Sequence, residues 1–236
     1  MKKIINFAII GLMSLVFFNG VILAETKIEQ RLQFLAGHTK LSKSSDITEK
    51  DVKLMWEKVQ LGIQLINSYW AETFKASGIR YITPTVKYYT SPVNTNCGKL
   101  PMNNAVYCGA DHTIYFDAIF FVRMMKGVGE QLGTDGDMAV IFVLAHEWGH
   151  AVQRMTGNNS KISIMNEENA DCVAGAFTRY SSIKGWLEDG DVQEALTVLQ
   201  AFGDELPWGA NGTHGTPDER IAKFKRGFKL GLSSCQ

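Results

Sequence analysis

The spacing of apolar residues predicts a chain that is mostly helical. Between Asp46 and about Ser77 apolar side chains recur three, four and seven positions apart, which is typical of an amphipathic helix, and Gly78 follows as a stop. Residues 138–157 are apolar on nearly every face, so we expect a helix at the centre of the domain. Further helices are predicted over the following segments: 158–185, with Asn158 to Ser160 as its cap, a segment containing Ala195 to Phe202, and 218–231.

Two segments have the composition of β-strands and predict two or three strands. Residues 80–90 and 105–121 alternate and are rich in β-branched and aromatic side chains. Residues 91–104, between them, consist of turn-forming residues. The glycines of residues 126–137 favour a plain connector, with the border of a cleft as the alternative. These patterns predict an α+β fold, mainly helical, with a small β-sheet.

The beginning of the chain has the pattern of an export signal. Lys2 and Lys3 precede an apolar stretch over residues 4–24, after which the sequence becomes polar. We expect residues 1–24 to be a signal peptide, or an N-terminal membrane anchor, because about 20 apolar residues can span a bilayer. The protein is then exported to the periplasm or the extracellular space, with membrane association through residues 4–24 if they are retained.

Composition bounds the domain organisation and the class of partner. A chain of 236 residues, 45% of them hydrophobic, can form one main domain, which we expect over residues 80–236. Residues 25–79 then form an N-terminal helical segment packing on it. The 24 basic residues balance the 24 acidic ones, and no basic run is present, so nucleic acid is excluded as an expected partner.

All four cysteines lie after the export signal, where an oxidising compartment permits disulfides. Cys97 and Cys108 flank a turn-rich segment of 11 positions that is easily closed, which leaves Cys172 to pair with Cys235. Buried free thiols are the alternative. A zinc site made of cysteines is disfavoured because no C-x-x-C pair occurs.

Candidate chemistry lies in "VLAHEWGHAVQ", residues 143–153. His146 and His150 are four positions apart, so on a helix they share a face and can reach one metal ion. Glu147 lies about 100° around the helix, where a carboxylate can take a proton from water at the open metal position. This is the H-E-x-x-H pattern of zinc hydrolases. Exposed polar residues are the alternative, which the apolar surroundings disfavour.

A third ligand is expected on the next helix, where "NEENADC" supplies three carboxylates. Glu167 and Asp171 are four positions apart and share a face, whereas Glu168 is turned away from it. We assign Glu167 to the zinc ion and Asp171 to a histidine N–H, because histidines that bind metals usually donate their other N–H to a carboxylate. A solvated helix face is the alternative reading of these acids.

Four stretches together resemble a known family: "YCGADHTIYFD", "AHEWGHAVQ", "EENADCVAGAF" and "THGTPDERI". Over about residues 80–236 the chain is similar to the bacterial neutral zinc metallopeptidases of the gluzincin group, which have HExxH followed by ExxAD. The resemblance implies a zincin-like domain with the sheet beside the HExxH helix. It also implies a site made of His146, His150 and Glu167 as ligands and Glu147 as the base. Because "EEN" departs from the family pattern, Glu168 stays a competitor of Glu167.

His214 lies in a glycine-rich stretch, "NGTHG", where a lone histidine is usually a solvated residue. The stretch resembles the "THG" segment of the same family and, more distantly, a segment of membrane zinc peptidases in which the histidine lies at the metal site. We therefore expect His214 at the cleft, donating a hydrogen bond to the oxyanion of the reaction. Reversible binding to the fourth zinc position is the alternative.

The sequence thus predicts an exported endopeptidase that binds one zinc ion (Zn2+) and hydrolyses peptide bonds of a peptide or protein substrate. Water activated by zinc attacks the peptide carbonyl, with Glu147 as general base. Two alternatives stay open. One is a zincin scaffold that bears zinc and acts as a protein-binding or chaperone module without significant turnover. The other is a zinc hydrolase of a non-peptide amide.

Overall fold

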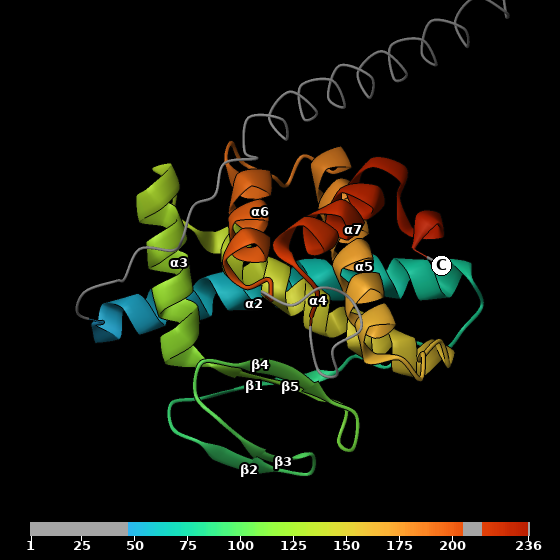
Figure 1. Cartoon of the computed structure of the whole chain (residues 1–236), viewed down its shortest axis with the longest axis horizontal. Helices are drawn as coiled ribbons and strands as arrows, with labels where there is room; N and C mark the ends of the chain where they lie inside the picture. The colour runs from blue at the N-terminus through green and yellow to red at the C-terminus, as the bar shows by residue number, and fades with distance from the viewer. Residues whose placement is uncertain (1–46, 205–213, 236) are drawn as a thin grey trace, which may run out of the picture. The chain divides into compact units, whose positions relative to one another are not determined.

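The computed structural model describes residues 47–204 and 214–235, all within one compact unit (Figure 1). The expected signal peptide or anchor, and the first part of the expected helical segment 25–79, lie outside these residues. None of the helices described is both long enough and apolar enough to cross a membrane.

The described residues form a mainly helical structure with a small sheet, which confirms the predicted α+β class. The α-helices are α2 (Glu49–Ala76), α3 (Ala118–Leu132), α4 (Asp137–Thr156), α5 (Ser163–Ile183), α6 (Asp191–Ala201) and α7 (Pro217–Leu230). A short 3-10 helix, η1 (Leu232–Ser234), follows α7.

The sheet has three strands in the order β1-β5-β4. The strands are β1 (Thr85–Tyr89), β4 (Ala105–Cys108) and β5 (Thr113–Asp117). The central strand β5 is entirely buried, and it pairs parallel with β1 and antiparallel with β4. A separate hairpin joins β2 (Val93–Thr95) to β3 (Gly98–Leu100). Since β4 forms one edge of the three-stranded sheet, its outer side is open to other groups.

Helix α4 is the central element, as its apolar sequence predicted. It packs against α2, α3, α5, α6 and β4. Trp148, Phe142 and Leu144 are almost completely buried. At the crossing with α5, Gly149 allows close approach, because a Cβ there would lie 2.8 Å from Val173 and 3.0 Å from the Cα of Ala170. This close packing brings the polar side chains of the two helices together.

The N-terminus of α4 is capped by a residue from another helix. Its own N-cap residue, Gly136, has no side chain to accept the first amide hydrogens. Glu194 of α6, completely buried, accepts hydrogen bonds from the backbone N–H groups of Gly136, Met138 and Ala139 at 3.2, 2.8 and 3.3 Å. The start of the HExxH helix is therefore fixed from outside by a carboxylate, which also suits the helix dipole.

Some predicted elements are wrong around helix α3. The second strand segment, predicted to extend to residue 121, contains β4 and β5, but β5 ends at Asp117, whose side chain caps α3 by accepting from the Ile119 N–H. The expected connector over 126–137 is helical as far as Leu132. Its Gly129 has a packing role, because a Cβ there would lie 2.8 Å from the Thr134 carbonyl oxygen.

Other predicted boundaries also shift. The segment 91–104 contains the β2–β3 hairpin, and residues 80–84 precede β1 without belonging to it. Helix α5 begins at Ser163 with Ile162 as its N-cap residue, so Asn158 to Ser160 do not cap it. Phe202 is the C-cap residue of α6 and lies just beyond its last turn.

Candidate metal centre

Two helices bring three expected ligands together. His146 and His150 lie on α4 and Glu167 on α5, with one ligand atom of each within 4.8 Å of the others. Nε2 of His146 lies 3.1 Å from one Glu167 oxygen, and Nε2 of His150 lies 3.5 Å from the other. Two imidazoles and one carboxylate are the protein ligands of many catalytic zinc sites, which leave a fourth position open. The donor set therefore fits a zinc ion.

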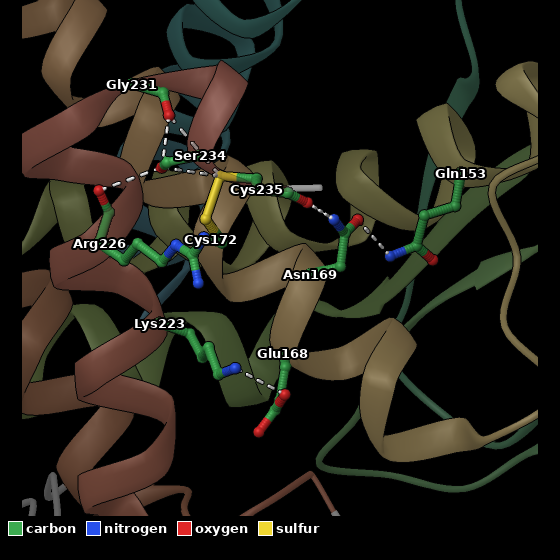
Figure 2. The surroundings of a disulfide bond; sticks show 9 residues. All are labelled: Gln153, Glu168, Asn169, Cys172, Lys223, Arg226, Gly231, Ser234 and Cys235. Atoms are coloured by element: carbon green, nitrogen blue, oxygen red, sulfur yellow. Dashed lines mark hydrogen bonds and ion pairs between the residues drawn. A yellow bond between two sulfur atoms is a disulfide. The ribbon is translucent and has the colours of Figure 1, made fainter.

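The competing acid, Glu168, is elsewhere. Its carboxylate forms an ion pair of 2.8 Å with the Nζ of Lys223 on α7, as Figure 2 shows. The structure thus brings Glu167 to the histidines and turns Glu168 toward the α5–α7 interface.

His146 is held by a buried ion pair. Its Nδ1 lies 2.8 Å from Asp171, whose side chain is completely buried. Arg220 of α7 binds both oxygens of the same carboxylate, through Nε at 2.8 Å and Nη2 at 2.9 Å. Burial favours the neutral acid, but the cations of Arg220 and His146 keep the pKa of Asp171 below its ordinary value. Asp171 was expected at this position, whereas Arg220 was missed, although it lies in the quoted "DERI" stretch.

His150 is held by neutral amides instead. Its Nδ1 lies 3.1 Å from Oε1 of Gln153, one turn further along α4. The Gln153 amide nitrogen donates to the Asn166 carbonyl at 2.7 Å and to Oδ1 of Asn169 at 2.9 Å. Gln153 is 3% exposed, so these bonds fix its side chain inside the protein. Neither amide was predicted from the sequence, and the position of Gln153 three residues after His150 was the one local indication.

A disulfide lies at the end of this network. Asn169 donates from its amide nitrogen to the carbonyl of Cys235, which is bonded to Cys172 of α5 (Figure 2). The second disulfide joins Cys97 to Cys108 at the end of β4. These are the two pairs that the sequence predicted.

The histidines and carboxylates of the site stabilise one another's charged forms and so shift one another's pKa values. Burial alone would lower the pKa of His146, but the carboxylates of Asp171 and Glu167 raise it. Burial alone would raise the pKa of Glu167, but hydrogen bonds and charges of both histidines lower it. An ionised carboxylate is ready to bind a metal, and the ion would displace the histidine protons.

Glu147 and His214 border the same site. The carboxylate of Glu147 accepts a hydrogen bond of 2.7 Å from the backbone N–H of Tyr107 on β4, so the edge strand orients it. His214 is 53% exposed at its side chain, with Nε2 4.0 Å from Glu167. Its backbone N–H donates to Asp204.

The site opens into a cleft with two arms that meet at Asn104, Ala105, Glu147 and His214. The polar arm has a volume of about 440 Å³, and its lining includes His150, Arg154, Asn159, Ser163 and Asn166. The apolar arm has a volume of about 240 Å³, and its lining includes Phe120, Phe142, Val143, Val198 and Phe202. A chain passing through the cleft would meet different surroundings on the two sides of Glu147.

A second carboxylate group has another explanation. Ligand atoms of Asp135, Asp137 and Glu194 also lie within 4.8 Å of one another. The Nζ of Lys58 lies 2.5 Å from Asp135 and 2.8 Å from Asp137, and Glu194 caps α4. Lys58 therefore forms ion pairs with the two aspartates, and the backbone N–H groups of α4 donate hydrogen bonds to Glu194, so these acids have partners without a metal ion.

Comparison with known proteins identifies the family of the chain. The model of a family described as "Putative neutral zinc metallopeptidase" matches residues 3–236. "Uncharacterized protein YpfJ" from Escherichia coli (strain K12) is 36% identical, over 69% of this chain and 63% of its own length. "Uncharacterized protein Rv2575" from Mycobacterium tuberculosis is 30% identical, over 64% of this chain and 60% of its own. The chain thus spans less than two thirds of these relatives. No solved structure matches.

Proposed function

Because the chain belongs to the neutral zinc metallopeptidase family, we propose that it is an exported, zinc-dependent endopeptidase. The observation that carries this proposal is the convergence of His146, His150 and Glu167 beside a cleft, with a fourth polar residue, Glu147, left for proton transfer. A zinc site that served only structure would need no such base and would usually fill its fourth position with a protein ligand.

The three convergent residues would hold the zinc ion. When bound, it would polarise the substrate carbonyl and lower the pKa of a water molecule. Asp171 and Gln153 would orient the two imidazoles, because each has an oxygen within hydrogen-bonding distance of an Nδ1 atom, which leaves Nε2 to bind the ion. These partners lie on α5 and near the end of α4, so they would hold the two imidazoles in place when the ion binds.

Glu147 would take the proton from the attacking water and pass it to the leaving amine. One of its oxygens is bound to the Tyr107 N–H, which leaves the other to accept the proton. Strand β4 is an edge strand that lines the cleft, so an extended peptide can lie along it as an added strand. The edge would then present the scissile bond to Glu147.

His214 would donate a hydrogen bond to the oxyanion that forms when water adds to the carbonyl. Its position at the junction of the two arms, with Nε2 4.0 Å from Glu167, supports this role. Loss of such a donor lowers kcat by about 100-fold to 1000-fold. His214→Ala with normal zinc content should therefore lose that much, and equal or higher activity would instead indicate a histidine that blocks the fourth zinc position.

We also propose that residues 1–24 direct export of the protein. If this segment is not cleaved, it would keep the protein at the membrane. Two disulfides support export, because such bonds persist mainly in oxidising compartments. Fractionation of cells that produce the full chain tests it. Protein found only in the cytosol would contradict export without affecting the proposed chemistry.

Glu147→Gln tests the proposed reaction. We expect the purified variant to keep one zinc ion per chain and to lose about 100-fold to 10,000-fold in cleavage of denatured casein, because general base catalysis contributes that much. Glu168→Gln is the matched control, since its acid is adjacent in sequence but paired with Lys223. It should keep both zinc and activity.

The assay also separates the two alternatives. Cleavage of casein or a cell-envelope extract by the wild type should stop with a chelator and return with zinc. Binding of denatured casein without cleavage would favour a chaperone module. Release of product only from non-peptide amides would favour the other hydrolase, and zinc loss in Glu147→Gln would contradict the division of roles.

A further inference from the structure

The polar arm of the cleft contains a cation that no described residue neutralises. Arg154, near the end of α4, lines this arm with its exposed side chain. Within residues 47–204 and 214–235 its guanidinium has no ion pair and no hydrogen bond. An unpaired guanidinium beside a catalytic cleft can bind an anionic group of a substrate.

The side chain of Arg154 packs against the backbone at Gly109. Gly109 follows β4 directly, and a Cβ at that position would lie 3.0 Å from Nη1, 3.2 Å from Cδ and 3.3 Å from Cζ of Arg154. The absence of a side chain at Gly109 thus lets the guanidinium lie against the end of the edge strand. The guanidinium therefore lies beside the end of β4, at the wall of the polar arm.

The position of Arg154 relative to the metal site limits where the anion can be. Arg154 lies four residues after His150 and eight after His146, so the three side chains leave the same face of α4. One helical turn advances about 5.4 Å, whereas an extended peptide advances about 3.3 Å per residue. An anionic group bound by Arg154 would therefore lie one or two residues from the scissile bond.

The other charges in the cleft are already engaged. Glu147 accepts a hydrogen bond from the Tyr107 N–H, and Glu167 faces the two candidate zinc ligands. In the apolar arm, Arg220 is paired with Asp171, and Asp204 accepts a hydrogen bond from the His214 backbone N–H. The other side chains lining the polar arm are mainly neutral, among them Asn104, Asn159, Ser163 and Asn166. Across Glu147, the apolar arm offers Phe120, Phe202, Val143 and Val198 to an uncharged side chain.

We infer that Arg154 is a specificity-determining residue that binds a substrate carboxylate one or two residues from the scissile bond, while the apolar arm takes a bulky apolar side chain on the other side. This inference rests on the proposed peptidase function, since it requires a peptide in the cleft. The carboxylate has two sources, an Asp or Glu side chain or the free C-terminus of the substrate. Both offer the planar pair of oxygens that a guanidinium binds.

Binding to a form that does not turn over tests the inference directly. Zinc-loaded Glu147→Gln protein is titrated against fluorescent peptides with a central Phe, in which Glu is placed one or two residues to either side. Each peptide has a Gln twin, and each is made with a free and an amidated C-terminus. We expect one Glu position, or the free C-terminus, to strengthen binding about 10-fold over its neutral twin.

The second change is in Arg154 itself. In the same background, Arg154→Gln should abolish the preference, Arg154→Lys should retain part of it, and Arg154→Glu should reverse it toward a peptide with Lys at that position. Arg123→Gln, an exposed arginine on α3 away from the lining of the cleft, is the matched control and should keep the preference. Because Arg154 is exposed, we expect all variants to unfold at the temperature of the parent.

The outcomes separate this inference from the proposed function. A preference for internal Glu identifies the side chain and agrees with an endopeptidase. A preference for the free C-terminus identifies that source and makes the protein a peptidase that releases C-terminal residues. Equal binding of acidic and neutral peptides, or a preference that survives in Arg154→Gln, overturns the role of Arg154 alone. If no peptide binds the zinc-loaded protein, the proposed peptidase function is overturned as well.

Discussion

The two candidate zinc ligands on α4 are supported in opposite ways. His146 is hydrogen-bonded to the completely buried carboxylate of Asp171, and Arg220 donates hydrogen bonds to both oxygens of that carboxylate. His150 is bonded to the amide of Gln153, which leads through Asn169 to the carbonyl of Cys235. The support of His146 is ionic and joins α4, α5 and α7. The support of His150 is a chain of neutral hydrogen bonds that ends at the Cys172–Cys235 disulfide.

The two supports differ in the energy that they contribute to the folded protein. Hydrogen bonds with an ionised partner are about twice as strong as neutral ones. Loss of one partner from a buried ion pair costs about 3 to 5 kcal/mol, because the other charge is left without compensation. A neutral hydrogen bond contributes about 0.5 to 1.5 kcal/mol. Disruption of the His146 side should therefore lower both stability and zinc affinity more than disruption of the His150 side.

Asp171→Ala should have the largest effect. We expect zinc affinity to fall about 100-fold, the upper end for partners of metal ligands, and the free energy of unfolding to fall by about 3 to 5 kcal/mol because Arg220 stays buried without its partner. Competition with a chromophoric chelator measures the first, and urea unfolding of the metal-free protein measures the second.

A double variant separates the effect of the buried Arg220 charge on stability from the effect of Asp171 on the orientation of His146. Adding Arg220→Met to Asp171→Ala removes the uncompensated cation, so stability should recover while zinc binding stays weak. A metal-free Asp171→Ala protein within about 1 kcal/mol of the wild type would contradict the ionic account of the His146 side.

Gln153→Ala should have a smaller effect on both zinc affinity and stability. The change leaves His150 without an acceptor but leaves no charge buried, so we expect zinc affinity to fall about 10-fold. The metal-free protein should lose about 1 to 3 kcal/mol, because its Asn169 partner also loses a hydrogen bond. Gln153→Glu keeps an acceptor for Nδ1 and should restore most of the zinc affinity.

Replacement of zinc by cobalt adds a readout of ligand orientation. The visible absorption of the cobalt protein should change in Gln153→Ala and return toward the wild type in Gln153→Glu. Gln193→Ala, on α6, is the control and should leave both spectrum and affinity unchanged. An unchanged spectrum in Gln153→Ala would show that the neutral network does not orient His150.

Local sequence patterns predicted the central features of the molecule well. The HExxH helix is apolar on nearly every face because neighbours surround most of it, so its burial could be predicted from its sequence. The spacing of His146 and His150, and of Glu167 and Asp171, places each pair on one helix face, and Gly149 then lets α5 approach. These features depend on residues that are close in sequence.

The features that were missed depend on distant residues or on glycines used for packing. Arg220 follows Asp171 by 49 positions, and Glu194 caps a helix that begins 57 residues earlier, at Asp137. No local periodicity reports such contacts. Helix α3 was missed because Gly129 reads as a loop residue, whereas in the fold it admits the backbone of the next turn.

Removal of the Cys172–Cys235 disulfide should have the smallest effect on zinc binding, because it acts on His150 through two amides. The bond closes a loop with a sequence separation of 63, so its loss should lower the free energy of unfolding by about 4 kcal/mol. The folded protein still has α5 packed on α7. We therefore expect the double Cys→Ser variant to bind zinc only about two- to threefold more weakly, a fraction of one neutral hydrogen bond.

The Cys97–Cys108 disulfide is the matched control for this last change. It closes a loop with a separation of 11 on the strand side of the molecule, and its loss should cost about 3 kcal/mol of stability. Since neither cysteine reaches the hydrogen bonds of His146 or His150, zinc affinity should not change. Both variants are compared by chelator competition well below their unfolding temperatures. Equal weakening in the two variants would trace the effect to general stability, and weakening only without Cys172–Cys235 would trace it to the Asn169–Gln153 network that holds His150.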